Sequence, residues 1–346
     1  MKVSVVIKAY NEESNIARAI ESSLRAVAPF GGEVIVADSV SSDRTVEIAM
    51  QYPVKIVQLE EPSERCCGIA PQLGYQHSSG EYIYILDGDM ELDGEFLKCA
   101  IDLLEREADV AGVGGFIAET RAMNLQFQRR MKRVLQQRAK ERKEAKCLSG
   151  GGLYRRSSIE SVGYISDRNL EAYEEYDLGA RLRAKGWRLV HLPMRAADHY
   201  SHALGTLQLL WFKLRTGSFL SQGQIVRTAL LNGYLPAAFR EIFALRLSAA
   251  VWLYWAVVLL ALLLLPYRLA TIGLVLVAIV GLALVLGIRH GSLGSGLLSV
   301  VTWHLLAFIA APGFFRRRRS PIDKIASRPL LDCAPNAEAR MQATAS

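Results

Sequence analysis

The first 120 residues alternate short apolar runs with longer stretches of helical periodicity. The apolar runs span residues 3–7, 34–37, 55–57, 82–86 and 110–116. Between them, apolar positions recur at near-helical spacing, as in the stretch from Ile16 to Val27, and the polar run "DSVSS" precedes a second helical stretch at 43–50. This alternation predicts an α/β domain with a mostly parallel central sheet and helices on both of its faces.

Polar side chains follow three of these predicted strands at the point where each strand ends. They are Asn11 and Glu12 after the first strand, Asp38 after the second, and Asp87 and Asp89 after the fourth. The carboxyl ends of parallel strands meet at one edge of a sheet, where ligands of such folds bind. The dispersed polar residues are therefore expected to form one site.

The stretch "EYIYILDGDMEL" delivers two carboxylates to the tip of a buried strand. Asp87 and Asp89 are hard oxygen donors of the kind that Mg²⁺ or Mn²⁺ prefers. An isolated Asp-x-Asp is more often a solvated turn, but the strand-tip position favours a metal held against a diphosphate. The chain has neither a G-x-x-x-x-G-K-[ST] nor a G-x-G-x-x-G motif, which argues against a kinase-like phosphate loop and a dinucleotide fold.

The C-terminal part has a different pattern, because from Ser248 the chain becomes almost uniformly apolar. Three apolar segments are each close to the length of a bilayer-spanning helix: 249–265, 269–288 and 296–315. The expected organisation is a catalytic domain at 1–202, interfacial helices at 203–247, a transmembrane region at 248–315 and a basic, disordered tail at 316–346.

Charge and cysteine content refine this picture. The net charge is +7, and much of the basic excess lies in residues 121–146, which hold ten Lys and Arg against two Glu. That stretch is either a solvated helix packed on the domain or a basic amphipathic helix at an anionic membrane. No nucleic-acid partner is expected. The five cysteines show no paired spacing, which favours a reduced, cytosolic catalytic part.

Four successive segments resemble the motifs of the family 2 glycosyltransferases. They are "VSVVIKAYNEESNIARAIESSL", "VIVADSVSSDRTVEIA", "GEYIYILDGDMEL" and "YEEYDLGARLRAKGWRLVHLP". Members of this family are inverting, nucleotide-sugar-dependent enzymes with the GT-A fold, and the resemblance covers about residues 1–200. The apolar C-terminal part resembles that of bacterial members that build exopolysaccharide or other lipid-linked glycans.

The resemblance implies a role for each strand-tip residue that matches a family motif. Ala9, Tyr10, Asn11 and Glu12 would border the nucleotide, and Asp38 would contact the uracil or the ribose.

The same resemblance implies a metal site. Asp87 and Asp89 would form the Asp-x-Asp pair, with Asp89 as the direct metal ligand and Asp87 also beside the donor. In the segment "DHYSH", His199 or His202 would supply a third ligand or contact the diphosphate, although either is equally well explained as a surface histidine.

Two positions depart from the family pattern. A Glu-Asp pair often precedes the last catalytic helix, and its Asp is the base; here the pair is Glu174–Glu175, which assigns the base to Glu175 with Glu174 as the alternative. The Arg-Asn that often occurs near "IAPQLG" is replaced by Pro71 and Gln72, so that Arg65 is the candidate substitute for a diphosphate-contacting arginine.

The expected function is transfer of a sugar from a nucleoside diphosphate sugar, uridine being the commonest base, to a lipid-linked or polysaccharide acceptor. A bound metal neutralises the leaving diphosphate, and a carboxylate base accepts the proton of the attacking hydroxyl. The alternatives are a processive polysaccharide synthase, a polyprenyl-phosphate sugar synthase and a non-catalytic membrane assembly module. The processive alternative is disfavoured because "LQLLWFK" lacks the Arg of Gln-x-x-Arg-Trp.

Membrane topology is predicted from the charges that flank the apolar segments. We expect an inner-membrane protein with a cytosolic catalytic domain. Three full spans would place the basic run 316–319 on the far side, which the positive-inside rule disfavours. The third segment contains Thr302, His304 and Pro312, and it is therefore predicted to be re-entrant or interfacial. A further span within 203–245 is the alternative.

Overall fold

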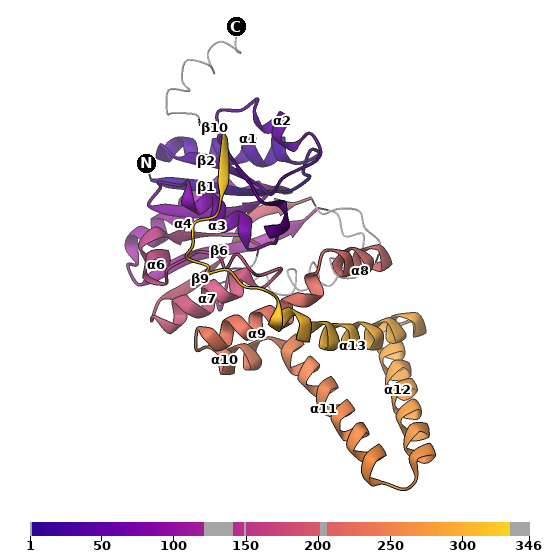
Figure 1. The fold of residues 1–346 in the computed structure, drawn as a ribbon. Coiled ribbons are helices and arrows are strands. Elements are labelled where there is room, and N and C mark those ends of the chain that lie inside the picture. The colour runs from indigo at the N-terminus through magenta and orange to yellow at the C-terminus, as the bar shows by residue number, and fades with distance from the viewer. Residues whose placement is uncertain (1, 121–140, 149, 201–205, 333–346) are drawn as a thin grey trace. The chain divides into compact units, whose positions relative to one another are not determined.

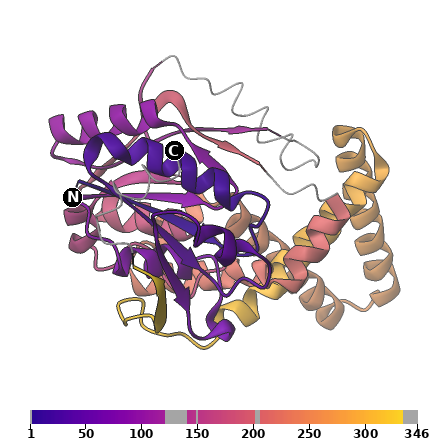
Figure 2. The same cartoon turned by 90° about the horizontal axis from the view of Figure 1, so that it is seen from above.

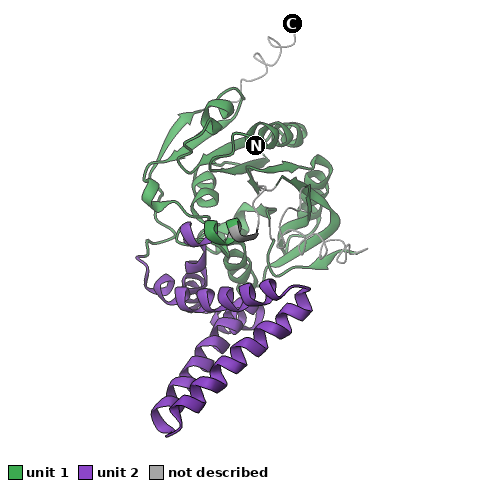
Figure 3. Cartoon of the chain, turned by 90° about the vertical axis from the view of Figure 1, so that its right-hand side faces the viewer, with its two compact units in different colours: residues 1–212, 318–346 green, residues 213–317 purple. Residues whose placement is uncertain are grey.

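The computed structural model describes residues 2–120, 141–148, 150–200 and 206–332. The chain divides into two compact units (Figure 3): unit 1 comprises residues 1–212 and 318–346, and unit 2 comprises residues 213–317. The greater part of the predicted basic helix at 121–146 lies outside the described residues. Its last part is not helical, because β7 (Lys143–Glu144) is a short strand.

Unit 1 contains all five strands that the apolar runs predict. They are β1 (Val3–Ala9), β2 (Glu33–Asp38), β3 (Lys55–Leu59), β4 (Tyr82–Asp87) and β6 (Val110–Glu119). The two predicted helices are also present, as α1 (Ile16–Val27) and α2 (Thr45–Ala49). Short 3-10 turns follow α1 at η1 (Ala28–Phe30) and β3 at η2 (Pro62–Glu64).

These strands join a single mixed sheet whose longest path has the order β10-β3-β2-β1-β4-β8-β6-β9-β5. Strands β1, β2, β3 and β4 run parallel to one another, as expected. Beyond β4 the sheet includes antiparallel pairs, which the sequence pattern does not indicate. The additional strands are β5 (Met90–Leu92), β8 (Gly152–Arg155) and β9 (Arg188–His199), and β7 pairs with β9 off the main path.

Helices cover both faces of this sheet. One apolar core contains residues of α1 and α4 (Gly94–Arg106), which lie side by side on one face (Figure 2). The second core contains residues of α3 (Ile69–Gln76), α6 (Arg156–Ser161) and α7 (Glu174–Ala184). Alternate residues of β1 enter the two cores, with Val5 in the first and Val6 in the second, as the two-residue period of a strand requires.

Unit 2 is helical (Figure 1). It contains η3 (Ser218–Leu220), α9 (Ser221–Leu231), α10 (Leu235–Glu241), α11 (Phe243–Leu264), α12 (Arg268–His290) and α13 (Leu293–Phe315), while α8 (Thr206–Arg215) spans the boundary between the units. The helices α11, α12 and α13 are long and apolar enough to cross a membrane. They correspond to the three apolar segments of the sequence.

After α13 the chain returns to unit 1, which corrects the prediction of a disordered tail over 316–346. Strand β10 (Ser327–Leu331) pairs antiparallel with β3 at the edge of the sheet, and the side chain of Ile325 is fully buried in the second core. The prediction gave weight to the arginines at 316–319 and overlooked the short apolar stretch behind them. Residues 333–346 lie outside the described residues.

Candidate active site

The parallel register of β1, β2 and β4 brings the predicted strand-tip residues to one edge of the sheet. Ala9 is paired with Asp38, and Lys8 with Asp87. Beyond the strand, the backbone N–H of Asn11 donates to Ser41 Oγ at 2.9 Å. The side-chain oxygen of Asn11 accepts a hydrogen bond from the backbone N–H of Ser42 at 2.8 Å. The loops that follow β1 and β2 are thus tied together at the predicted nucleotide position.

Asp38 is fully buried, and neutral donors satisfy its carboxylate. Ser41 Oγ donates to Asp38 Oδ1 at 2.5 Å, and Gln58 Nε2 donates to Asp38 Oδ2 at 2.8 Å. A buried carboxylate needs such partners. These hydrogen bonds fix the orientation of Asp38 at the end of β2.

Tyr10 is exposed beside these loops, and its ring carries the guanidinium of Arg65, whose Cζ lies 4.0 Å from the ring centroid. This contact is a cation–π interaction. It holds Arg65, the candidate diphosphate-contacting arginine, next to the tip of β1. Gln72, by contrast, has a structural role, because its Oε1 accepts hydrogen bonds from the backbone N–H groups of Ile165 and Ser166 at 3.1 and 3.3 Å.

The end of β9 brings a histidine to the second residue of the Asp-x-Asp pair. Nε2 of His199 lies 3.0 Å from Asp89 Oδ2, and its Nδ1 lies 2.6 Å from Glu119 Oε2. Burial lowers the pKa of His199, but hydrogen bonds to the two carboxylates outweigh burial and raise the pKa to about 10. Glu119, at the end of β6, was not identified from the sequence. His202 lies outside the described residues.

Asp89 and His199, once the imidazole has lost its extra proton, are suitable ligands for a divalent metal that takes few ligands from the protein. Among the residues that the structure describes, no group of three or more His, Cys, Asp or Glu surrounds a common metal position. Mg²⁺ commonly takes only one or two protein carboxylates and completes its shell with water and substrate phosphates. Glu119 on the second nitrogen of His199 is the kind of outer partner that orients a metal-ligating imidazole.

Asp87 is paired differently, with a lysine from the neighbouring strand. Lys8 Nζ lies 2.5 Å from Asp87 Oδ1 and 3.9 Å from Glu174 Oε1. Burial lowers the pKa of Lys8, but the charges of Asp87 and Glu174 outweigh it and raise that pKa. Sequence analysis missed Lys8, although a lysine that follows four apolar or small residues in "SVVIK" was the available signal.

The two candidate bases begin helix α7. Tyr173, which precedes the helix, has a left-handed backbone with φ of 72°, and Glu174 and Glu175 occupy the first turn. Both glutamates line one pocket together with Lys8 and Tyr154. Burial, followed by the charge of Glu175, raises the pKa of Glu174. The acidic pair, the lysine and Asp87 thus form one charged cluster at the edge of the sheet.

Asp177, on the same helix, forms an ion pair with Arg181. It is fully buried, and its Oδ2 accepts from Nε and Nη2 of Arg181 at 2.9 and 2.8 Å. Arg181 in turn donates to the backbone carbonyl of Tyr164 at 2.7 Å. This pair anchors α7 to the segment before it and thereby fixes the helix that carries the two glutamates.

A family model matches the N-terminal part of the chain. Residues 4–163 match the family described as Glycosyl transferase family 2. The chain is also similar to a dolichol-phosphate mannosyltransferase of Pyrococcus furiosus, with 27% identity over 135 residues. That match covers 38% of this chain and 38% of the relative, so the chain spans well under half of the relative's length.

Solved structures share the fold at low sequence identity. The mannosyltransferase PcManGT from Pyrobaculum calidifontis, in complex with GDP-Man and Mn²⁺, has a TM-score of 0.57 and 17% identity, with 91% of this chain and 87% of that chain covered. S. aureus TarS 1-349, in complex with UDP-GlcNAc, has a TM-score of 0.55 and 17% identity, with 92% and 93% covered. Residues 4–163 thus match glycosyl transferase family 2, and the chain has a GT-A-like mixed α/β domain.

Proposed function

We propose that this protein is a membrane-associated, inverting glycosyltransferase that moves a sugar from a nucleoside diphosphate sugar to a lipid-linked acceptor. The observation that carries the proposal is the convergence of Asp38, Asp87, Asp89 and the Glu174–Glu175 pair at the carboxyl edge of one sheet. The family match supports the reaction class.

The donor would bind across the tips of β1 and β2. Asp38, whose buried carboxylate holds Ser41 and Gln58, would shape the site for the base or the ribose, and Ala9, Asn11 and Glu12 would border the nucleotide. Arg65, stacked on Tyr10, presents a cation near the same loops, where it would contact the diphosphate. A planar guanidinium suits a phosphate because it can donate two parallel hydrogen bonds.

Asp89 and His199 would hold Mg²⁺ or Mn²⁺. When bound, the metal supplies positive charge to the diphosphate as it leaves the sugar. The tight ion pair with Lys8 gives Asp87 a different task, which is to fix the tip of β4 and keep its own charge neutralised. Glu119 orients the imidazole of His199 from behind.

Glu175 would accept the proton from the acceptor hydroxyl as that oxygen attacks the anomeric carbon. A single displacement from the face opposite the diphosphate inverts the anomeric centre, so one base is sufficient. Glu174 is the alternative base, but its proximity to Lys8 favours a role in holding the charged cluster together.

The acceptor is proposed to be a lipid phosphate or another lipid-linked glycan. The similar protein of Pyrococcus furiosus is named for dolichol phosphate, and the three apolar helices of this chain favour a substrate that lies in a membrane. A polysaccharide acceptor and a role in exopolysaccharide synthesis remain the second candidate, which is favoured only by the membrane region.

The connectivity supports an even number of membrane crossings. Strand β10 follows unit 2 and β3 precedes it, yet the two strands pair in one sheet. The two ends of unit 2 must therefore lie on one side of the membrane. A cytosolic location of unit 1 at the inner membrane agrees with the supply of nucleotide sugars and leaves the basic run 316–319 inside.

The hairpin of α11 and α12 would make the two crossings, while α13 lies at the interface. Within unit 2, α13 lies across the open end of that hairpin and beside α9 (Figure 1). Arg227 of α9 donates to the backbone carbonyl of Phe314 at 3.1 Å. A charged side chain that contacts the C-terminal turn of α13 is easier to accommodate in the headgroup region than in the hydrocarbon core.

The full-length protein in detergent or nanodiscs provides the test. A thermal-shift panel of nucleoside diphosphate sugars with Mn²⁺ identifies the donor, and transfer is then assayed with polyprenyl phosphate and with glycan acceptors. We expect metal-dependent transfer of one sugar with inversion. Absence of both donor binding and transfer across the panel would refute the proposal, and long polymeric products would instead indicate a processive synthase.

A further inference from the structure

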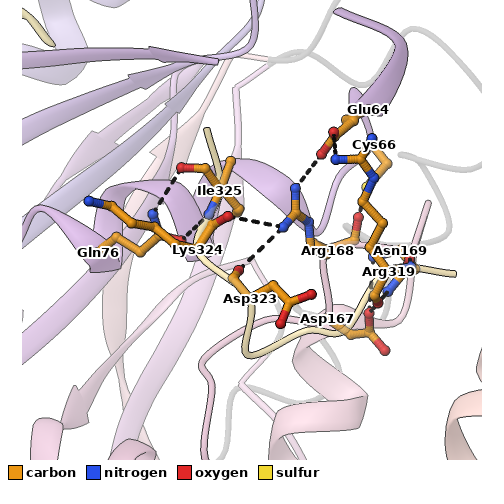
Figure 4. Close-up of polar contacts among 10 residues, drawn as sticks. All are labelled: Glu64, Cys66, Gln76, Asp167, Arg168, Asn169, Arg319, Asp323, Lys324 and Ile325. Carbon is orange, nitrogen blue, oxygen red and sulfur yellow. Dashed lines mark hydrogen bonds and ion pairs between the residues drawn. The ribbon is translucent and has the colours of Figure 1, made fainter. Parts of the chain in front are cut away.

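The segment that returns from unit 2 makes specific polar contacts beside the candidate active site. We call residues 318–331 the C-terminal strap. Its first part lies along the loop 167–169, which precedes α7 and its two glutamates (Figure 4). Its last part is β10, at the edge of the sheet. The family match ends at residue 163 and does not include the strap.

Asn169 and Arg319 are joined by a reciprocal pair of hydrogen bonds. Asn169 Nδ2 donates to the backbone carbonyl of Arg319 at 2.8 Å, and the backbone N–H of Arg319 donates to Asn169 Oδ1 at 2.8 Å. Next to this pair, Arg318 Nη2 lies 3.6 Å from the fully buried carboxylate of Asp167. The strap is thus bound in register, because a one-residue shift would break both hydrogen bonds of the amide.

Arg168 extends from the loop in the opposite direction and is almost completely buried. Its Nη1 donates to the backbone carbonyl of Asp323 in the strap at 3.2 Å, and its Nη2 pairs with Glu64. Arg319 of the strap pairs with the same glutamate (Figure 4). A buried guanidinium is costly unless its donors are satisfied. Here the strap supplies a large part of the hydrogen-bond acceptors that the guanidinium of Arg168 needs.

The strap contacts two loops: residues 167–169, and residues 64–68, which include Glu64. These two loops are also packed on each other. Gly68 donates its backbone N–H to the carbonyl of Leu170 at 2.9 Å, and Cys66 Sγ donates to the carbonyl of Arg168 at 3.0 Å. A Cβ at Gly68 would lie 2.1 Å from the carbonyl oxygen of Asp167, so no larger residue fits between the loops.

Both loops lead directly into the candidate site. The first continues through Leu170 to Glu174 and Glu175 at the start of α7. The second places Arg65, adjacent to Glu64, over the ring of Tyr10. A displacement of the strap would therefore move the candidate base and the candidate diphosphate ligand together.

We propose that the C-terminal strap is a positioning element of the active site, and that Arg319, Arg168 and Asn169 are positioning residues. The inference rests on the proposed function, because it concerns the geometry of that same site. Since the strap begins directly after α13, the site reaches its working geometry only when the chain has passed through unit 2 and returned. Misplacement of catalytic groups by about 1 Å can lower a rate by about a hundredfold.

The competing explanation is that the strap only covers the edge of the sheet. Strand β10 pairs with β3, and Gln76 exchanges two hydrogen bonds with the backbone of Ile325, at 2.9 and 3.3 Å. These contacts serve stability and do not involve the residues of the loop 167–169. A purely structural strap would change the melting temperature and the active fraction of the protein, whereas a positioning strap changes kcat per active site.

The test uses the full-length protein and its transfer assay. Arg319→Ala removes the pair with Glu64 but leaves the backbone hydrogen bonds to Asn169. It should lower kcat about tenfold and also raise the donor KM, because Glu64 adjoins Arg65. Arg319→Lys, which keeps a cation for Glu64, should recover most of the rate. Arg317→Ala removes an equal charge from a residue that makes no ion pair within the described part of the chain, and it is the matched control.

A second pair of variants removes the strap itself. A chain ending at Arg317 should lose kcat by about a hundredfold, whereas a chain ending at Asp332 should keep the wild-type rate. Wild-type kcat per active site in both Arg319→Ala and the chain ending at Arg317 would overturn the inference while leaving the proposed function intact. Absence of transfer in the wild-type protein would instead refute the proposed function, and the strap inference with it.

Discussion

The two units of this chain differ in where their apolar side chains lie: in the interior of unit 1, and on the surface of the long helices of unit 2. In unit 1, strand residues such as Ile7 and Ile83 are fully buried, and polar groups collect at the strand ends. In unit 2, apolar residues face outward: Leu269 and Ile288 are 86% and 80% exposed. Three consecutive helices with such exposed apolar surface are long and apolar enough to cross a membrane. The two units are therefore built for different solvents.

The charged groups differ between the units in the same way. Unit 1 contains the half-buried ion pair of Lys8 with Asp87 at the strand edge and the buried ion pair of Arg181 with Asp177. The three long helices of unit 2 carry few charges, and those lie at or near the helix ends. The comparison supports the proposal that unit 1 carries the chemistry and unit 2 the membrane attachment. Because the strap belongs to unit 1, unit 2 is inserted within the sequence of unit 1 and does not simply follow it.

The largest effect is expected from the candidate base. Glu175→Gln should bind the donor normally, but its kcat should fall by about 10²–10⁴-fold, because the acceptor hydroxyl loses its proton acceptor. Single-turnover transfer with saturating donor measures this. Glu174→Gln is the matched control, and if Glu174→Gln is the inactive variant while Glu175→Gln is nearly normal, the assignment of the base must be exchanged.

The metal assignment predicts the next largest effect. Asp89→Asn should lose metal-dependent transfer, with a cost of several kcal/mol in transition-state stabilisation. Chelation of the wild-type protein should have the same effect and should be reversed by Mn²⁺. Circular dichroism checks that the variant is folded, and turnover at the wild-type rate with saturating Mg²⁺ or Mn²⁺ would exclude Asp89 as a ligand.

Lys8 connects the strand tip to the acidic helix, and its removal should destabilise unit 1. Lys8→Met leaves the carboxylates of Asp87 and Glu174 without their shared cation, which should lower the free energy of unfolding by about 3 kcal/mol. Denaturant unfolding of the full chain measures it. Lys98, an exposed residue of α4, serves as a control through Lys98→Met. An equal loss in both variants would contradict a special role for Lys8.

The basic stretch at 121–146 is expected to give the smallest effect per residue. Its central residues lie outside the described part of the chain, so the prediction rests on sequence alone. Replacement of Arg129, Arg130, Lys132 and Arg133 by Gln should weaken binding to anionic vesicles by about 1 kcal/mol per charge. Vesicle co-sedimentation at low and high salt measures it. Binding that neither salt nor the substitutions change would favour the solvated-helix alternative.

The N-terminal half of the fold and the strand-tip residues could be predicted from the sequence because both depend on local patterns. Apolar runs such as 82–86 are buried strands, and polar residues such as Asp38 end them. The antiparallel strands were not predicted because their sequences mix charged and apolar residues. The segment "RLVHLPMRAADH" of β9 contains five charged or histidine residues and a proline, and only pairing with β6 and β5 makes it a strand.

The charged contacts of the site were harder to predict than its carboxylates. The Asp-x-Asp pair is visible as a motif, whereas Lys8, Glu119 and Glu64 acquire partners only through tertiary contacts. The strap shows the same limit. Its contact between Asn169 and Arg319 joins residues on either side of unit 2, and no local sequence pattern specifies such a pair.

The central claim is that both parts of unit 1 lie on one side of the membrane, with the α11–α12 hairpin crossing it. After all five native cysteines are replaced by serine, a single cysteine is introduced by Tyr267→Cys, between α11 and α12, or by Ser320→Cys, in the strap. Spheroplasts are treated with an impermeant maleimide. Tyr267→Cys should react from outside, and Ser320→Cys should react only after lysis. Labelling of Ser320→Cys in intact spheroplasts would contradict the account.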